Sequence, residues 1–308
     1  MDHRSPLVWE IGIVCYDSVS SLRVVGVRQG SGNASATRYG RRMASLPAAA
    51  PLPAHALLTG PVRPGRVVGV HPSCVYVVSD PGEVVAVETA DGLGLPCALR
   101  LGLDRDARPF RAVAVGDPAA VGAGRVVAGP FAAEVVRWWA PPVVRRSRDR
   151  QPQWQEALEG LLRDVRPPVD PALAPHELLG RGPGLTPAGD DVLAGWLLAV
   201  HHDPDLPADL ATAVEAAPAT TTALSAALLR EAVQGRGVPA AVALADALGG
   251  HGDLGAALDR LLRVGHTSGA ALALGLLRGA RLVSSRGEMP HSAPGTHQSA
   301  DPDAGVAA

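Results

Sequence analysis

The sequence predicts an α+β protein, in which an antiparallel β-rich N-terminal domain, built like a barrel or sandwich, precedes a mostly α-helical C-terminal domain. Hydrophobic residues make up 47% of the 308 residues and charged residues 19%, which is a composition that folds. Short valine-rich runs between Gly and Pro turns fill the first half, as in small closed sheets. In the second half, apolar residues recur at helical spacing.

The expected strands are short, β-branched and bounded by turn residues. Turn sequences occur at His71-Pro72-Ser73, Ser79-Asp80-Pro81-Gly82 and Gly116-Asp117-Pro118. The Ala/Pro-rich stretch at 46–58 is expected to be a loop or a short helix. The strand-sized runs lie at 24–27, 66–70, 74–78, 84–87, 112–115 and 125–127.

Prolines and a basic run mark the boundary between the halves. Pro141-Pro142 precede a run at 145–150 with four arginines in six residues, which either binds an anionic partner or forms a solvated linker. The linker is favoured, because no aromatic residues are interleaved with the arginines. The predicted domains are therefore 1–145, β-rich, and 151–283, helical, with a disordered tail at 284–308 that lacks periodicity.

Helical spacing is clearest where the second half begins. Trp154, Leu158, Leu161, Leu162 and Val165 fall on one face of a helix. Glycines at 235, 237, 249 and 250 are typical of helix ends. Further helices are expected at 191–201, 206–216, 221–234, 239–248, 254–264 and 268–280.

Composition excludes several function classes. All 28 basic side chains are arginine, so neither a Schiff-base lysine nor a Walker-type phosphate loop is possible. Cys15, Cys74 and Cys97 lie too far apart in the sequence for a disulfide framework or a zinc site. Cys74 and Cys97 are predicted to be buried, inert thiols. A net charge of -2 favours neither nucleic acid nor an anionic membrane as partner. Without an apparent signal peptide or membrane-spanning run, a cytoplasmic protein is expected.

The first candidate site is the glycine-rich segment at 180–191. Gly182 and Gly184 belong to a set of three glycines in five residues, which permits positive φ and close approach of a ligand. Thr186 is expected to cap a helix, with the proline after it at the first helical position. The N–H groups of such a helix start suit a phosphate or carboxylate.

Asp190 and Asp191 fall in the first turn of that helix. They either complement the helix dipole or serve a site, where they would hold a metal ion or accept a proton. The spacing alone favours the first interpretation, and the glycine density adds weight to the second, because a helix cap does not require three glycines upstream.

The second candidate is GHTSG at 265–269, which opens the last expected helix. Thr267 or Ser268 can cap that helix, and His266 is either a satisfied capping group or a catalytic one. Two such helix starts can face one ligand, with Arg181 and His266 adding positive charge. In the third candidate, residues 220–225, the threonines are more often caps but can line the same pocket.

At these residues the sequence resembles a bacterial family, the AllH-type subunit of oxamate carbamoyltransferase. The resemblance rests on GRGPGLTPAGDDVLAGWL at 180–197, the Thr-, Ser- and Leu-containing run at 221–237, and GHTSG at 265–269. Their order and spacing match, and a β-rich half that ends in W-x-P at 139–141 also fits. The resemblance extends over about residues 7–283, and its first motif is the specific one.

The resemblance implies a carbamoyltransferase component of allantoin or purine-ureide breakdown, where oxalurate and phosphate give oxamate and carbamoyl phosphate. It implies small anionic ligands, and FdrA-like proteins as candidate partner subunits; Mg²⁺ is a candidate cofactor. Arg181 and the helix starts would hold phosphate, Asp190 or Asp191 would be the general base or metal ligand, and His266 a proton donor. Family positions place ligand contacts at Gly182, Gly184, Thr186, Asp190, Asp191, His266, Thr267 and Ser268.

The sequence departs from the family in one place, because GHTSG continues with Ala270-Ala271 where Ala-Asp is usual. If that acidic residue holds a metal or orients a catalyst, activity is altered or lost here. A second hypothesis is therefore a non-catalytic subunit that binds a small anionic metabolite and assembles with larger partners. A third is a scaffold whose glycines serve helix packing.

Overall fold

The computed structural model describes residues 45–147 and 152–287, and the described residues from Leu46 onward belong to one compact unit. The strand expected at 24–27, Cys15, and residues 288–308 of the expected tail lie outside the described residues.

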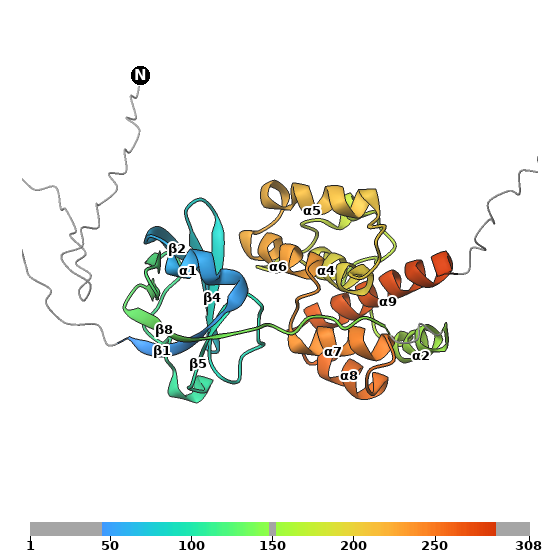
Figure 1. Ribbon diagram of the computed structural model, residues 1–308, viewed down its shortest axis with the longest axis horizontal. Coiled ribbons are helices and arrows are strands. Elements are labelled where there is room, and N and C mark those ends of the chain that lie inside the picture. Colours follow the sequence, from blue (N-terminus) through green and yellow to red (C-terminus); the bar gives the residue numbers. More distant parts are fainter. Residues whose placement is uncertain (1–44, 148–151, 288–308) are drawn as a thin grey trace, which may run out of the picture. The chain divides into compact units, whose positions relative to one another are not determined.

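Eight strands close into a barrel in the order β1-β5-β4-β3-β2-β6-β7-β8 (Figure 1). The predicted α+β class is confirmed, but the sheet is mixed, because β1 pairs with β8, and β4 with β5, in parallel. The chain crosses over between β4 and β5 instead of turning back in a hairpin, and a parallel pair requires such a crossover. The strands are β1 (Leu46–Pro51), β2 (Arg63–His71), β3 (Cys74–Ser79), β4 (Glu83–Glu88), β5 (Ala98–Leu101), β6 (Pro118–Gly122), β7 (Arg125–Ala128) and β8 (Phe131–Trp139).

Valine side chains fill the barrel. Val75 and Val77 of β3, and Val85 and Val87 of β4, are completely buried in its core. Tyr76 points to the other face of β3 and packs against the helical core, since successive side chains of a strand alternate. The strands expected at 66–70, 74–78, 84–87 and 125–127 are confirmed within β2, β3, β4 and β7.

The expectation for residues 46–58 is wrong in its first part. Residues 46–51 form β1, and only then follow a 3-10 turn (Leu52–Ala54) and helix α1 (His55–Thr59). Alanine and proline have low strand propensity, but β1 is paired on both sides, with β5 and β8. Ala48 and Ala50 are buried there, so tertiary pairing overrides local preference.

The strand expected at 112–115 is also wrong, because this segment forms turns. Its polar groups bond locally: Asp117 Oδ2 accepts the N–H of Ala114 at 2.9 Å, and the Gly116 N–H donates to Val67 O at 2.8 Å. Strands β5, β6 and β8 were missed, since each contains alanine, glycine or charged residues that weaken the strand pattern.

Every predicted helical run contains a helix, and α7 matches its expected bounds. The short α3 was not expected, and α9 continues four residues past the predicted tail boundary at 283, to Gly287. The helices are α2 (Pro152–Leu162), α3 (Pro175–Leu178), α4 (Ala188–Val200), α5 (Ala208–Thr220), α6 (Ala223–Val233), α7 (Pro239–Leu248), α8 (Leu254–Leu262) and α9 (Ser268–Gly287).

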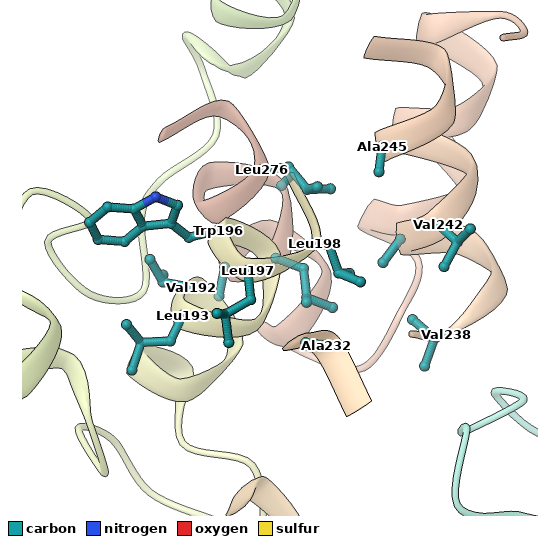
Figure 2. Packing of buried hydrophobic residues seen from close by; sticks show 14 of the residues in the cluster. Val192, Leu193, Trp196, Leu197, Leu198, Ala232, Val238, Val242, Ala245 and Leu276 are labelled. Carbon is teal, nitrogen blue, oxygen red and sulfur yellow. The ribbon is translucent and has the colours of Figure 1, made fainter. Parts of the chain in front are cut away.

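The close packing of α4 on α9 depends on glycine. A Cβ atom at Gly195 of α4 would lie 2.2 Å from Leu272 O, and one at Gly275 of α9 would lie 2.0 Å from Val192 O. Contacts this short are sterically forbidden, so only glycine permits this helix separation. Figure 2 shows the apolar side chains of α4 next to those of α7 and α9 in the helical core.

The basic segment after Pro142 is bonded to the helical region where it is described, although Arg145 and Arg146 remain exposed. The Val144 N–H donates to Gly235 O at 2.9 Å. Arg145 donates to both carboxylate oxygens of Asp246, from its backbone N–H at 2.7 Å and its Nε at 2.9 Å. Residues 148–150 of the basic run lie outside the described residues.

Cys74 and Cys97 are free and buried, as predicted. Burial raises the pKa of both thiols, that of Cys97 to about 12, so neither is a ready nucleophile near neutral pH. Among the described helices, none has both the length and the hydropathy that a membrane span requires.

Candidate functional site

A pocket with a cavity volume of about 100 Å³ lies where the start of α4 meets α6, α7, α9 and the loop before β5. It brings together residues from all three candidate motifs. Its polar lining residues are Tyr76, Thr186, Asp190, Asp191, Ser225, Arg236 and Ser268. The shared pocket that the sequence suggested for the two glycine-rich helix starts is therefore present.

Asp191 is the lining residue best suited to chemistry. Its side chain is buried, with a residue exposure of 7%, and its Oδ2 has no hydrogen-bond partner among the described residues. Burial raises the pKa of Asp191 from 3.8 to about 7; a hydrogen bond with Ser268 opposes this rise, and the nearby charge of Asp190 adds to it. A carboxyl group with this pKa can accept or donate a proton near neutral pH.

Asp190, its neighbour, has both carboxylate oxygens engaged within the protein. Oδ1 accepts the N–H of Gly180 at 2.7 Å, and Oδ2 accepts the hydroxyl hydrogen of Thr221. These bonds fasten the glycine-rich loop and the start of α6 to α4. The geometry therefore favours a positioning role for Asp190 and leaves Asp191 as the candidate acid or base.

Replacing Asp190 with alanine is expected to lower the free energy of unfolding by about 2–3 kcal/mol, because two part-buried donors lose a buried acceptor. Chemical denaturation would measure this loss. Asp259→Ala, on the exposed side of α8, is the control and should change stability by less than about 0.5 kcal/mol. An Asp190→Ala protein as stable as the control would show that these bonds contribute little.

The backbone N–H groups expected to bind an anion are largely used within the chain. The Gly189 N–H donates to Arg181 O at 2.9 Å, and the Gly269 N–H donates to Val264 O at 3.0 Å. The cap of α4 is Pro187 and makes no side-chain hydrogen bond, so the expected capping by Thr186 is wrong. Thr186 lines the pocket instead.

The motif glycines have two different uses. Gly180, Gly182 and Gly184 have φ values of 72°, 120° and 95°, so the predicted positive φ is confirmed. Gly189 and Gly269 instead serve packing, because a Cβ atom would lie 1.9 Å from Leu178 O in the first case and 2.0 Å from Leu261 O in the second. The scaffold hypothesis thus holds for these two positions.

The structure separates the predicted site residues into two sets. Those that line the pocket are Thr186, Asp190, Asp191 and Ser268, joined by Ser225 of the third motif. Thr222, also of the third motif, caps α6 by accepting the Ser225 N–H at 3.0 Å. Those that are exposed and outside the lining are Arg181, Gly182, Gly184, His266 and Thr267. Ala271, at the position where the family usually has Asp, is completely buried.

Sequence reasoning missed two polar lining residues, one from the barrel and one from the segment between α6 and α7. Tyr76 lines the pocket, and burial raises the pKa of its hydroxyl far above the usual range. The alternation of β3 was the available signal, since Tyr76 lies between two inward-facing valines. Arg236 was read only as part of a helix end; it lines the pocket and pairs with Glu231.

A resident metal ion does not fit these residues. Among the described residues, no group of three or more His, Cys, Asp or Glu side chains could hold one. Both carboxylate oxygens of Asp190 accept hydrogen bonds from Gly180 and Thr221, so only Asp191 would be left to bind the ion. These residues therefore give Mg²⁺ no role in the reaction.

Residues 178–280 match the family model described as oxamate carbamoyltransferase subunit AllH. This stretch contains the three motifs and every pocket-lining residue that the helical region contributes. No solved structure matches the chain. The wider extent of the resemblance, over about residues 7–283, stays a prediction outside the matched stretch. The match confirms the resemblance that the motifs predict: the stretch at 178–280 is similar to the family described as oxamate carbamoyltransferase subunit AllH.

Proposed function

We propose that this chain is a subunit of an oxamate carbamoyltransferase-like enzyme, which moves a carbamoyl group between phosphate and a small carboxylate-bearing ureide. The pair would be oxalurate and oxamate, in allantoin or purine breakdown. The observation that carries the proposal is the buried Asp191 carboxylate, with one oxygen unpartnered among the described residues, in the wall of a pocket within the family-matched region.

Asp191 would handle the proton of the transferred group. When the amide nitrogen of oxamate attacks carbamoyl phosphate, a C–N bond forms, the C–O bond to phosphate breaks, and the nitrogen gives up one proton. The Asp191 carboxylate would take that proton, oriented by its hydrogen bond with Ser268. In the reverse direction the protonated carboxyl group would return it to the departing nitrogen.

Phosphate would be held by groups outside this pocket. Arg236 is the one cation among the lining residues described, and Glu231 pairs with it. Asp190 and Asp191 add negative charge, which disfavours a dianion there. Partner subunits, for which FdrA-like proteins are candidates, would supply the phosphate contacts.

The same lining favours a second candidate function. A chain that binds a small metabolite but lacks phosphate contacts would serve as a binding and assembly subunit, with the reaction carried out by its partners. In that case Asp191 would contribute to ligand affinity and not to turnover.

The test is carbamoyl transfer by the assembled complex, with wild-type chain or Asp191→Asn. We expect the substitution to lower turnover by roughly 10²- to 10⁴-fold, as for loss of a general base or acid. Asp259→Asn is the exposed control and should leave turnover unchanged. Thermal shifts with phosphate, carbamoyl phosphate and oxamate would report binding in the same preparations.

Full turnover by Asp191→Asn, with weakened ligand binding, would support the assembly function instead. Full turnover together with unchanged binding would show that this pocket takes no part in the reaction.

A further inference from the structure

A buried carboxyl group outside the proposed chemistry holds the loop between β4 and β5 (residues 89–97). Glu88, the last residue of β4, is 1% exposed. Its Oε2 accepts the N–H groups of Gly94 at 2.9 Å and of Leu95 at 3.2 Å. Successive backbone N–H groups that converge on one oxygen form a nest, an arrangement that proteins use to bind anions. The loop is therefore wound around the Glu88 carboxyl group as it would be around a bound anion.

The backbone of this loop fits closely between Glu88 and the first turn of α7. Gly94 has a φ of 76°, a conformation that favours glycine. A Cβ atom there would lie 3.0 Å from Cδ of Pro239, and one at Gly92 would lie 2.9 Å from Cβ of Glu88. Neither position accepts a side chain unless a neighbour moves, so the loop has one close-fitting arrangement on this carboxyl group.

The part of the loop that is bonded to this carboxyl group is also the part that lines the pocket. Leu93, Leu95 and Pro96 belong to the pocket wall. The first part of the loop is outside the lining and is held separately by Asp91, whose Oδ1 accepts the N–H of Arg105 at 3.0 Å. The two bonds to the buried carboxyl group therefore act on the pocket wall itself.

This arrangement has an energetic cost that the loop bonds offset. Burial raises the pKa of Glu88, and the N–H groups of Gly94 and Leu95 oppose the rise. Oε1 is buried without a partner among the described residues. An apolar side chain of similar size would fill the same space without this desolvation, but it would leave both N–H groups of the loop without an acceptor.

We propose that Glu88 is a positioning residue for the pocket, because it fixes residues 93–96 so that this wall is in place before a ligand binds. A wall that is ordered only on binding lowers affinity, since its conformational entropy is then lost in the binding step. The effect falls on affinity and leaves the chemical step at Asp191 unchanged. The inference rests on the proposed function for the identity of the ligand, but not for the order of the loop.

The experiment combines the kinetics of carbamoyl transfer to oxamate by the assembled complex with amide hydrogen exchange of the full chain. We expect Glu88→Ala to raise the KM for oxamate roughly tenfold with kcat nearly unchanged, since only binding loses a preformed wall. The N–H groups of Gly94 and Leu95 should lose protection from exchange in the same variant. Glu88→Gln keeps an acceptor oxygen in place and should retain most of the wild-type KM and protection.

Three controls separate positioning of the wall from a general loss of stability. Val126→Ala, in the barrel core and outside the pocket lining, should destabilise the barrel and leave KM unchanged. Formate fits the space vacated in Glu88→Ala and should restore both KM and amide protection, whereas sulfate, which is too large for that space, should restore neither. Glu88→Leu keeps the buried volume without an acceptor, and it makes the same test if the alanine variant does not fold.

An unchanged KM in Glu88→Ala, or an equal rise in Val126→Ala, would overturn the inference and leave the proposed function standing. A loss of kcat at unchanged KM would overturn it as well, because Glu88 would then act in the chemistry. If the wild-type complex transfers no carbamoyl group, the proposed function fails together with the identity of the ligand. Amide exchange and its rescue by formate then decide by themselves whether Glu88 holds the wall.

Discussion

Replacing Gly275 with alanine is expected to lower the free energy of unfolding by about 3 kcal/mol or more, the upper end of what overpacking costs. The added Cβ atom would lie 2.0 Å from Val192 O and 2.9 Å from Trp196 N, both backbone atoms of α4. Backbone cannot rotate away as a side chain can, so α4 and α9 would have to separate. Urea denaturation would measure the loss as a lower midpoint at unchanged slope.

Gly160→Ala is the matched control. Gly160 lies on the exposed side of α2, with nothing within 4 Å of the added Cβ atom. Alanine favours a helix interior over glycine by about 0.5–1 kcal/mol, so this variant should be more stable than wild type. If both alanines had the same effect, the α4–α9 contact would not set the helix separation.

Replacing Asp191 with asparagine is expected to make the protein more stable at pH 8 while leaving it nearly unchanged at pH 4. Burial raises the pKa of Asp191 from 3.8 in a solvated chain to about 7 in the folded protein. The folded state therefore binds a proton more readily, and this contribution to stability is complete below pH 4 and lost as the pH rises through 7. The difference corresponds to up to about 4 kcal/mol, which the uncharged amide avoids.

The measurement is the difference in unfolding free energy between wild type and Asp191→Asn at several pH values, since subtraction removes the contribution of other titrating groups. The difference should grow between pH 4 and pH 7 and level off above pH 7. Asp259→Asn should give no such trend. A constant difference across this range would mean that Asp191 titrates with an ordinary carboxyl pKa in the folded chain.

The sequence by itself determined the features that depend on neighbouring residues. Helical periodicity placed seven helices, and the valine runs between turn residues placed four strands of the barrel. The density of Gly180, Gly182 and Gly184 predicted positive φ, and the motifs predicted the family resemblance that the match at 178–280 supports. These signals are local, because side-chain spacing and backbone preference act within a few residues.

Other features depend on residues far apart in the chain, and only the tertiary structure decided those. β1 is a strand because β5 and β8 pair with it, and its alanines give no sign of that. Asp190 and Asp191 are adjacent and chemically identical, yet one is bonded to Gly180 and Thr221, and the other has a buried oxygen without a partner among the described residues. The sequence likewise did not indicate that Tyr76 of the barrel lines the pocket. Pairing, burial and desolvation arise between segments far apart in the chain, so no local pattern encodes them.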